Sequence, residues 1–492
     1  MPRQESGITL SLATDPVDAA YSPISIFAII KAGVGPSSSH TMGPWSAALD
    51  FVDRLKLRGI NMVERVTVTL MGSLAKTGRG HGTHTAIIMG LMGEDYRTSD
   101  LEQMPGRVDQ VRKTGRLSLG GVLELDFDPA RDIVPDPASI CPVHPNTLAF
   151  YAKFGGGESL TETYYSIGGG FLQREGAPQA PLAAVTLRYP VTLGADLIRW
   201  CDSSGLAIHD VVRENETAWR STDEIDAALD QLFATMIDSI ENGCHADGVL
   251  PGGLQVRRRA RSIHDRLMAG RRYGTRAEWI RQIRQTPPDL ATSTSWITAF
   301  ALAVSEVNAA YGRIITAPTN GACGVLPAVL FHWWLFTPGA DIHQVRRFLL
   351  VAGEVGCIFK KGATISAAAG GCQAEIGVSS AMAAAALTAV MGGSPRQCLM
   401  AAEIAMEHHL GMTCDPVGGL VQVPCIERNS MGAMKAVTAS QLALFGNPDD
   451  AKVSLDAVIT TMMETARDMH SRYKETGDGG LALRIPVVLA DC

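Results

Sequence analysis

The hydrophobic periodicity of this chain changes once along its length, and this change limits the fold more than any other feature of the sequence. Up to about residue 190, apolar and polar residues alternate in short segments: in "VERVTVTLMGS" Val66, Val68 and Leu70 alternate with threonines, and "GVLELDFD" has the same period of two. Later segments are long and helical, such as "STDEIDAALDQLFATMIDSIENG", where Ser221 and Glu224 form a capping box. We therefore predict an α+β N-terminal domain followed by a larger all-α domain.

Composition and charge exclude several classes of protein. The 492 residues are 46% hydrophobic and 19% charged, which suits a soluble chain with two or three buried cores. The net charge of −7 gives no reason to expect nucleic acid as a partner. We see no secretory signal and no membrane span, so we expect a cytoplasmic protein without membrane contact. In that compartment the ten cysteines are expected to be thiols or metal ligands rather than disulfides.

Two glycine-rich loops of the N-terminal half contain polar side chains that suit a small anionic ligand. In "KTGRGHGTHTA", His81 and His84 lie in a turn between a strand and a helix, where a histidine can act as a base. In "KAGVGPSSSHTMGP" the glycines allow close backbone approach, and the loop suits a carboxylate ligand or, equally, a serine-rich helix N-cap. The hydroxyl and amide donors of this second loop surround His40 and are Ser37, Ser38, Ser39 and Thr41.

The cysteines of the C-terminal half fall into two groups by their sequence context. Cys357 and Cys398 lie in apolar helical segments and are predicted to be buried as small hydrophobic residues. Cys372, Cys414 and Cys425 instead lie in breaks rich in glycine or proline at helix ends, in "GGCQAE" and "TCDPVGGLVQVPC". Three thiolates that meet in space would suit an iron–sulfur cluster with one reactive iron, but zinc and simple burial stay open from spacing alone.

Several motifs taken together resemble the bacterial, single-chain, iron–sulfur-dependent L-serine dehydratases. They are "GVGPSSSHTMGP", "HGTHTA", "HPNT", "APTNGACGVLPAVL", "GGCQAEIGV", "AAEIAMEHHLGMTCDPVGGLVQVPCIERNSMGAMKA" and the ending "GGLALRIPVVLADC". The resemblance implies a small-molecule-binding-like β-type domain over residues 22–190, a linker over 191–220 and an all-helical, cluster-binding catalytic domain over 221–476. It also implies a C-terminal tail, 477–492, that docks in the active site, and a homodimer.

The resemblance also implies roles for individual residues. Cys372, Cys414 and Cys425 match three ligands of a 4Fe-4S cluster, and the terminal Cys492 would occupy the fourth iron in the resting enzyme. His81 would be the base, because the family motif HGTD has an aspartate where this chain has His84. His40 is expected to be catalytic together with the loop that anchors the substrate carboxylate. The implied substrate-binding residues are Ser37, Ser38, Ser39, Thr41, Asn146 and Asn320.

The implied reaction converts L-serine into pyruvate and ammonia, with iron acting as a Lewis acid on the β-hydroxyl, a poor leaving group. A pyridoxal-phosphate dehydratase could perform the same elimination, but it needs a Schiff-base lysine, and only Lys360 or Lys361 could be suggested. A non-catalytic amino-acid sensor could use the N-terminal domain to bind its ligand, but it would not need three cysteines at kinked helix ends. Ten arginines between Arg257 and Arg284 are interpreted as a solvated helical face or a domain contact, in preference to an anion site.

Overall fold

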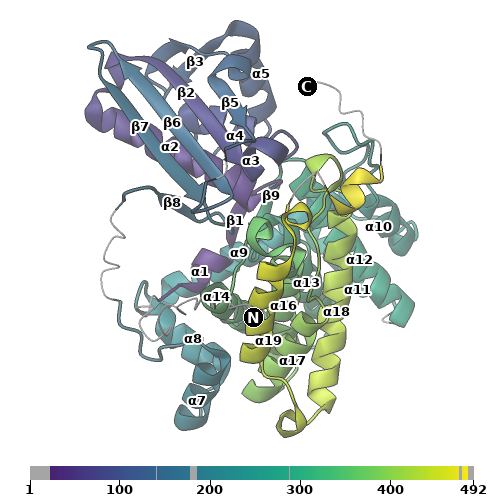
Figure 1. The fold of residues 1–492 in the computed structure, drawn as a ribbon. Helices are drawn as coiled ribbons and strands as arrows, with labels where there is room; N and C mark the ends of the chain where they lie inside the picture. Colours follow the sequence, from purple (N-terminus) through teal and green to yellow (C-terminus); the bar gives the residue numbers. More distant parts are fainter. Residues whose placement is uncertain (1–22, 140, 178–184, 288, 476–478, 486–492) are drawn as a thin grey trace, which may run out of the picture.

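The chain folds into an N-terminal α/β region that sits on a larger helical region (Figure 1). The structure is a computed structural model that describes residues 23–139, 141–177, 185–287, 289–475 and 479–485. This arrangement confirms the predicted order of an α+β part followed by a mostly helical part.

The N-terminal region is built around a five-stranded sheet with the strand order β5-β2-β6-β7-β8. Strand β2, next to the edge strand β5, pairs antiparallel with the central strand β6 and parallel with β5. Val66, Val68 and Leu70 of β2 are buried, as their alternation predicts. Helix α2 covers the sheet, and Phe51 stacks on Phe150 with ring centroids 5.0 Å apart. The elements are η2 (Ser38–Met42), α2 (Gly43–Arg58), η3 (Ile60–Met62), β2 (Val63–Gly72), α3 (Ser73–Thr77), α4 (Thr83–Leu91), α5 (Met104–Thr114), β3 (Arg116–Leu119), β4 (Leu123–Asp126), α6 (Pro129–Asp132), β5 (Ile133–Asp136), β6 (Asn146–Phe154), β7 (Ser159–Ser166) and β8 (Leu172–Arg174).

The helical region surrounds one central helix, α16, which is rich in alanine. Its side chains are buried along almost its whole length, and α13, α14, α17 and α18 pack around it. Small side chains let these helices approach α16 closely. The elements are α7 (Gly194–Ser204), α8 (Ile208–Glu216), α9 (Thr222–His245), α10 (Ala260–Met268), α11 (Arg276–Arg284), α12 (Leu290–Ala309), η4 (Asn320–Ala322), α13 (Val325–Phe336), α14 (Ile342–Gly362), α15 (Ala367–Gly370), η5 (Cys372–Ala374), α16 (Ile376–Val390), α17 (Pro395–Glu407), η6 (Val417–Gly419), α18 (Cys425–Phe445), η7 (Pro448–Asp450), α19 (Leu455–Asp468), η8 (Ser471–Tyr473) and η9 (Gly480–Leu483).

Two features of the helical region differ from the predicted boundaries. Residues 191–220, predicted to be a linker, fold into α7 and α8, because apolar residues such as Leu197 and Val211 are buried in the core of the helical region. The predicted all-α domain also contains one strand, β9 (Arg313–Thr316), which pairs antiparallel with β1 (Lys31–Val34). Helix α1 (Ile26–Ile29) packs on α14, so the start of the described chain lies against the helical region.

Helix α12 is long and apolar enough by composition to cross a membrane. It packs against α9, α10 and α18, and Trp296 and Phe300 on it are buried. Burial inside the helical region therefore accounts for the composition of α12, which is a core helix.

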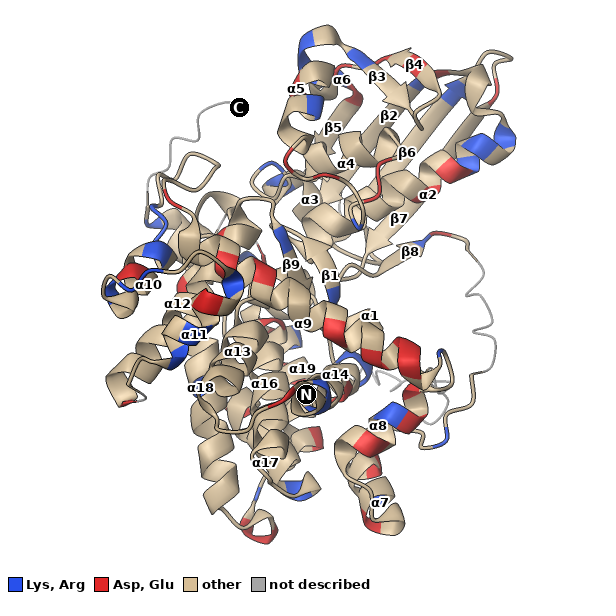
Figure 2. Ribbon diagram, turned by 180° about the vertical axis from the view of Figure 1, so that it is seen from behind, with Lys and Arg blue, Asp and Glu red and all other residues tan. Residues whose placement is uncertain are grey.

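The arginines of the 257–284 segment lie on and around α10 and α11, where blue and red segments are interspersed (Figure 2). Arg259 pairs with Glu427 at 2.7 Å, and Arg276 pairs with Asp238 at 2.7 Å. Both arginine side chains are partly exposed. These contacts fit the interpretation as a solvated face with paired charges.

Candidate active site

A small pocket lies where the N-terminal and helical regions meet. Residues from both regions line it, including Ser37, His81, Cys372, Glu375, Cys414, Cys425, Arg428 and Glu475.

The three cysteines at helix ends all line this pocket, although each comes from a different break in the backbone. Cys372 begins the 3-10 helix η5 ahead of α16, and Cys425 is the first residue of α18. Cys414 lies between α17 and η6, where its backbone N–H donates a 2.7 Å hydrogen bond to the Tyr473 carbonyl. The segment with two prolines and a glycine pair therefore returns Cys425 to the same pocket as Cys414.

The position of Cys372 depends on the residue before it. Gly371 has a φ of +73°, in the left-handed region that favours glycine. A Cβ atom on Gly371 would lie 2.7 Å from the carbonyl oxygen of Met412, a backbone atom that cannot rotate away. Glycine is therefore required at position 371, where the backbone passes close to the segment that leads to Cys414.

Two charged residues beside the thiols were not assigned from the sequence. The Arg428 guanidinium donates a 3.3 Å hydrogen bond to Cys372 Sγ and a 3.1 Å hydrogen bond to Asp415 Oδ1. A carboxylate oxygen of Glu375 and the Sγ atoms of Cys372 and Cys414 all lie within 4.8 Å of one another. Glu375 follows Cys372 by three positions, and Arg428 follows Cys425 by three positions. This spacing places the charged residue and its cysteine on one side of a helical turn, and it is the sequence signal that could have identified Glu375 and Arg428.

The chemistry of these donors fits a soft metal centre. A hydrogen bond with Cys372, followed by burial, raises the pKa of Cys414 well above its ordinary value, and burial does the same for the pKa of Cys425. These two thiols are therefore protonated at neutral pH, and a metal that binds thiolates would displace the protons. Three thiols facing one pocket suit an iron–sulfur cluster, and zinc accepts the same donors.

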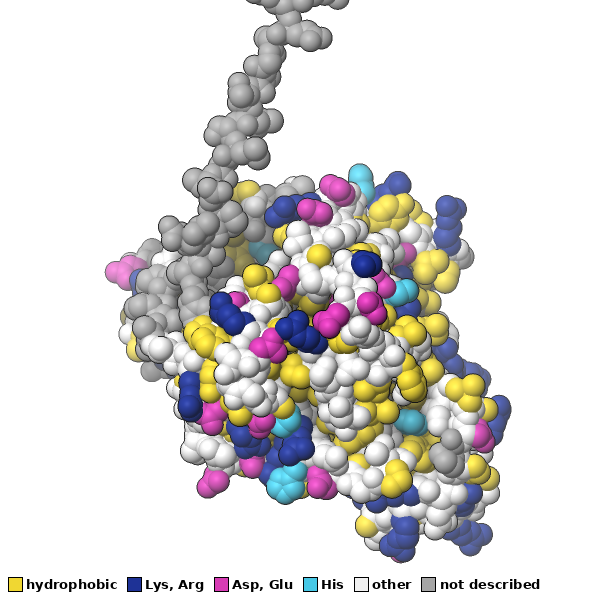
Figure 3. Space-filling model, turned by 90° about the horizontal axis from the view of Figure 1, so that it is seen from below, with side chains coloured by type: hydrophobic (Ala, Val, Ile, Leu, Met, Phe, Trp, Pro, Cys, Tyr) yellow, Lys and Arg dark blue, Asp and Glu magenta, His cyan; other side chains and the backbone are white. Residues whose placement is uncertain are grey.

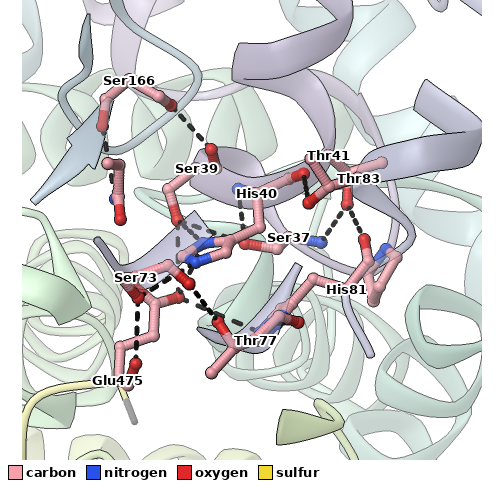
Figure 4. A network of polar contacts seen from close by, with 12 residues as sticks. Ser37, Ser39, His40, Thr41, Ser73, Thr77, His81, Thr83, Ser166 and Glu475 are labelled. Carbon is pink, nitrogen blue, oxygen red and sulfur yellow. Dashed lines mark hydrogen bonds and ion pairs between the residues drawn. The ribbon is translucent and has the colours of Figure 1, made fainter. Parts of the chain in front are cut away.

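Two buried histidines of the N-terminal region, His40 and the pocket-lining His81, lie with their ring centroids 4.5 Å apart (Figure 4). Both ring nitrogens of His40 have hydroxyl partners, Ser39 at 2.9 Å and Ser73 at 3.2 Å. His81 Nδ1 lies 3.0 Å from the Thr77 carbonyl and so carries the proton, which leaves Nε2 with a free lone pair. Burial lowers the pKa of His81 to about 4 and lowers the pKa of His40 well below its ordinary value, so both rings are neutral at neutral pH.

Glu475 joins the histidines and was not found by sequence reasoning. Its Oε1 lies 3.3 Å from His40 Nδ1 and 4.0 Å from His81 Nε2 (Figure 4). Burial, followed by the charges of Glu375 and Cys372, raises the pKa of Glu475 well above its ordinary value. In "SRYKETGD" this residue has the sequence context of an ordinary surface glutamate, so no local signal marks it.

The serine-rich loop caps a helix and also borders the pocket. Ser37 Oγ accepts a 3.1 Å hydrogen bond from the His40 N–H and caps η2, which confirms the N-cap interpretation for this residue. Ser37 also lines the pocket. Thr41 Oγ1 donates a 2.7 Å hydrogen bond to the His81 carbonyl and so ties the two loops together. Ser38, Ser39, His40 and Thr41 are buried but are not among the lining residues.

Two other predicted site residues, Asn320 and Asn146, do not line the pocket. Asn320 accepts a hydrogen bond from Thr316 at 2.6 Å and donates one to the Val34 carbonyl at 2.7 Å, so its side chain joins β9 to β1. Asn146 is buried at the start of β6, outside the pocket lining. Cys492 lies outside the described residues.

The fold and the pocket define an enzyme for a small polar substrate, with a neutral histidine facing a group of soft metal donors. The family model described as serine dehydratase beta chain matches residues 25–177, and the one described as serine dehydratase alpha chain matches residues 203–482. The chain belongs to the serine dehydratase family, as its motifs predict.

Curated relatives match over almost their full length. An L-serine dehydratase of Streptomyces coelicolor is 47% identical over 467 residues, which cover 94% of this chain and 99% of the relative. L-serine dehydratase TdcG of Escherichia coli is 43% identical over 465 residues, which cover 94% of this chain and 99% of the relative. An L-serine dehydratase of Mycobacterium tuberculosis is 43% identical over 477 residues, covering 95% of this chain and 100% of the relative.

Proposed function

We propose that this chain is an L-serine dehydratase, which converts L-serine into pyruvate and ammonia. The observation that carries the proposal is the meeting of His81 with Cys372, Cys414 and Cys425 in one pocket of a serine dehydratase chain. The proposed substrate is inferred from the names of the relatives, whose alignments cover 94% of this chain.

The histidine side of the pocket would handle the α-proton. The hydrogen bond to the Thr77 carbonyl fixes the His81 ring, so its Nε2 can accept a proton from the α-carbon. Burial keeps this base neutral before it reacts. The Ser37 hydroxyl at the pocket wall can donate to the substrate carboxylate. After the β-hydroxyl has left as water, the aminoacrylate product tautomerises to an imine, and water hydrolyses the imine to pyruvate and ammonia.

The cysteine side would hold the cofactor. We propose Cys372, Cys414 and Cys425 as ligands of a 4Fe-4S cluster, which when bound would supply a Lewis-acidic iron for the β-hydroxyl. Arg428 supports this assignment, because its guanidinium donates a hydrogen bond to Cys372 Sγ and places a positive charge beside the proposed ligands.

The two rival functions have less support. Neither lysine suggested for pyridoxal phosphate lines the pocket: Lys361 Nζ donates to the Val191 carbonyl at 2.6 Å, and Lys360 Nζ lies over the Phe171 ring at 3.8 Å. A sensor would not need a buried histidine base opposite three thiols. Membership of a dehydratase family also favours the enzyme.

The role of the terminal cysteine stays a proposal. Helix η9, within the predicted tail, is held beside the site, because the Leu481 N–H donates a 2.8 Å hydrogen bond to Asp415 Oδ2. This supports the prediction that Cys492 reaches the fourth iron and that serine displaces it. A Cys492→Ala protein should then keep its cluster but show an altered KM for serine and faster inactivation in air.

Anaerobic purification with iron and sulfide analysis, beside a pyruvate assay with L-serine, tests the function. We expect turnover that depends on iron and a broad brown absorption that is lost in air. Turnover without iron, or an absorption band of an internal aldimine, would contradict the proposal. We further propose that the enzyme is cytoplasmic and forms a homodimer.

A further inference from the structure

One oxygen of the Glu475 carboxyl group lacks a regular hydrogen-bond partner among the described residues. Glu475 Oε2 is buried and accepts no hydrogen bond of good geometry from them, although the backbone N–H of Ala368 also lies near the carboxyl group. Glu475 lines the pocket, and its side chain is only 6% exposed. Buried acceptors in folded proteins almost always have a partner, so an orphan acceptor in a substrate pocket indicates a group that a ligand would satisfy.

The charges around Glu475 show what kind of group is missing. Its other oxygen, Oε1, faces His40 and His81, which burial keeps neutral, and the Ser39 hydroxyl at 3.4 Å. Among the described lining residues the one permanent cation is Arg428, and this guanidinium is engaged by Cys372, Asp415 and the Thr413 carbonyl. A buried carboxylate without a cationic partner is unfavourable, which is why burial raises the pKa of Glu475, and a cation brought by the ligand would stabilise the ionised form.

The second acidic residue of the pocket has a different position. Glu375 lies among the thiols, with a carboxylate oxygen within 4.8 Å of both Cys372 Sγ and Cys414 Sγ. Glu475 instead lies on the histidine side, with Oε1 4.0 Å from His81 Nε2. A cation bound at Glu475 would therefore lie next to the base.

We infer that Glu475 Oε2 binds the α-ammonium group of the amino-acid substrate and so selects α-amino acids over α-hydroxy acids. The inference rests on the proposed function, because it assumes an amino-acid substrate at this pocket. The ammonium nitrogen is bonded to the carbon that loses its proton. Holding that nitrogen at Glu475, and the carboxylate at the Ser37 loop, fixes two substituents of the α-carbon and directs its hydrogen toward His81 Nε2.

The test compares two ligands that differ only in the recognised group. L-Glycerate has the carboxylate and β-hydroxyl of L-serine but a hydroxyl in place of the ammonium. Binding of each ligand to the anaerobic holoenzyme is measured by equilibrium dialysis, beside KM for serine and competitive inhibition by glycerate. In Glu475→Gln we expect serine affinity to fall roughly 10²-fold, the usual effect of breaking a buried charge pair, and glycerate affinity to change less than about threefold.

Matched variants separate recognition from structural damage. Glu403→Gln removes a buried carboxyl on α17, outside the pocket, and should leave both affinities unchanged. If Glu475→Gln does not fold, Glu475→Asp is used instead, because it keeps the charge on a shorter side chain. Glu475→Asp should lower the affinity for serine roughly tenfold and should not lower the affinity for glycerate to the same extent. Equal weakening of both ligands, or unchanged serine affinity, would overturn the inference. Absence of serine turnover in the wild-type holoenzyme would instead overturn the proposed function.

Discussion

At the scale of single residues, the cysteines differ in their surroundings: Cys372, Cys414 and Cys425 line the pocket, whereas Cys357 and Cys398 are buried in the core of the helical region. Cys425→Ser should abolish bound iron, visible absorption and serine turnover together, because one of three proposed ligands is lost. Iron and sulfide analysis of the anaerobically purified protein measures this.

Cys357→Ser is the matched control for the cysteine variants. Cys357 is buried in the helical core, and its Sγ donates a hydrogen bond to the Ile24 carbonyl at 3.5 Å, which a serine hydroxyl can keep. Cys357→Ser should therefore have the same iron content as the wild-type protein. Full iron content in Cys425→Ser would contradict the ligand set.

His81→Ala should lower kcat roughly 10²-fold while iron content stays unchanged, the usual effect of losing a general base. His84→Ala, in the same turn but outside the pocket lining, should change kcat less than about threefold. Single-turnover rates and exchange of the α-hydrogen with solvent measure the step directly. Unchanged exchange in His81→Ala would place the base elsewhere.

The same histidine predicts a pH dependence. Burial lowers the pKa of His81 to about 4, so the unprotonated base is present above this pH and is lost only as the pH falls through about 4. We expect kcat to be flat between about pH 5.5 and 7.5, without the loss near pH 6.5 that an exposed histidine would cause. An inflection near pH 6.5 that disappears in His81→Ala would contradict this.

At the scale of elements, the turn before η5 decides whether Cys372 meets Cys414. In Gly371→Ala the left-handed backbone costs roughly 1 kcal/mol or more, and the new Cβ would also collide with the Met412 carbonyl. We expect iron occupancy below about half of the wild-type value. Gly392→Ala has a φ of +90° but no atom within 4 Å of the new Cβ, so it is strained without a collision and should keep its iron. Equal iron content in the two variants would contradict this role of Gly371.

Helix α14 contains a carboxyl group whose protonation affects stability. Burial raises the pKa of Glu354 to about 7, so the folded chain holds this proton where the unfolded chain has released it. Stability from this group is therefore fully present below about pH 4.5 and is lost as the pH rises through about 7, by about 3 kcal/mol.

Glu354→Gln removes this dependence on pH. Relative to wild type, the variant should gain about 3 kcal/mol in its free energy of unfolding between pH 4.5 and pH 8, as measured by urea denaturation at both pH values. Glu464→Gln on the exposed face of α19 is the control for loss of a surface carboxyl. Parallel stability profiles of Glu354→Gln and wild type would contradict the prediction.

At the scale of the whole molecule, α18 presents an apolar stripe to solvent. Met431, Leu442 and Phe445 lie on one side of the helix and are exposed, Phe445 by 89%. Figure 3 shows hydrophobic side chains, in yellow, exposed between charged ones over the end of the helical region. An exposed apolar stripe of this kind supports the proposed contact with a second copy of the chain.

Phe445→Glu should shift the mass in solution from twice 52.4 kDa to 52.4 kDa, because a charge would be buried in the proposed contact. Light scattering after gel filtration measures this. Leu57→Glu, at a side chain that is 88% exposed on α2, should leave the mass unchanged. A monomeric wild-type protein would contradict the proposed dimer.

Much of the fold follows from local pattern. The period of two in β2 and the capping box at Ser221 appear where the sequence places them, because each depends on residues only a few positions apart. The motifs around Cys372, Cys414 and Cys425 likewise identify the family without any structure. The helices α7 and α8 within the predicted linker were not foreseen, because their apolar positions have meaning only once a core exists to bury them.

The sequence by itself determined the fold class, the family and the residue types of the chemistry. Tertiary structure alone decided which of those residues share a pocket. It brought Ser37 and His81 from the N-terminal region to the cysteines of the helical region, paired β1 with β9, and added Glu475 from near the end of the chain. The physical reason is range: helical and strand periods act over a few residues, whereas a pocket forms where segments distant in sequence pack together.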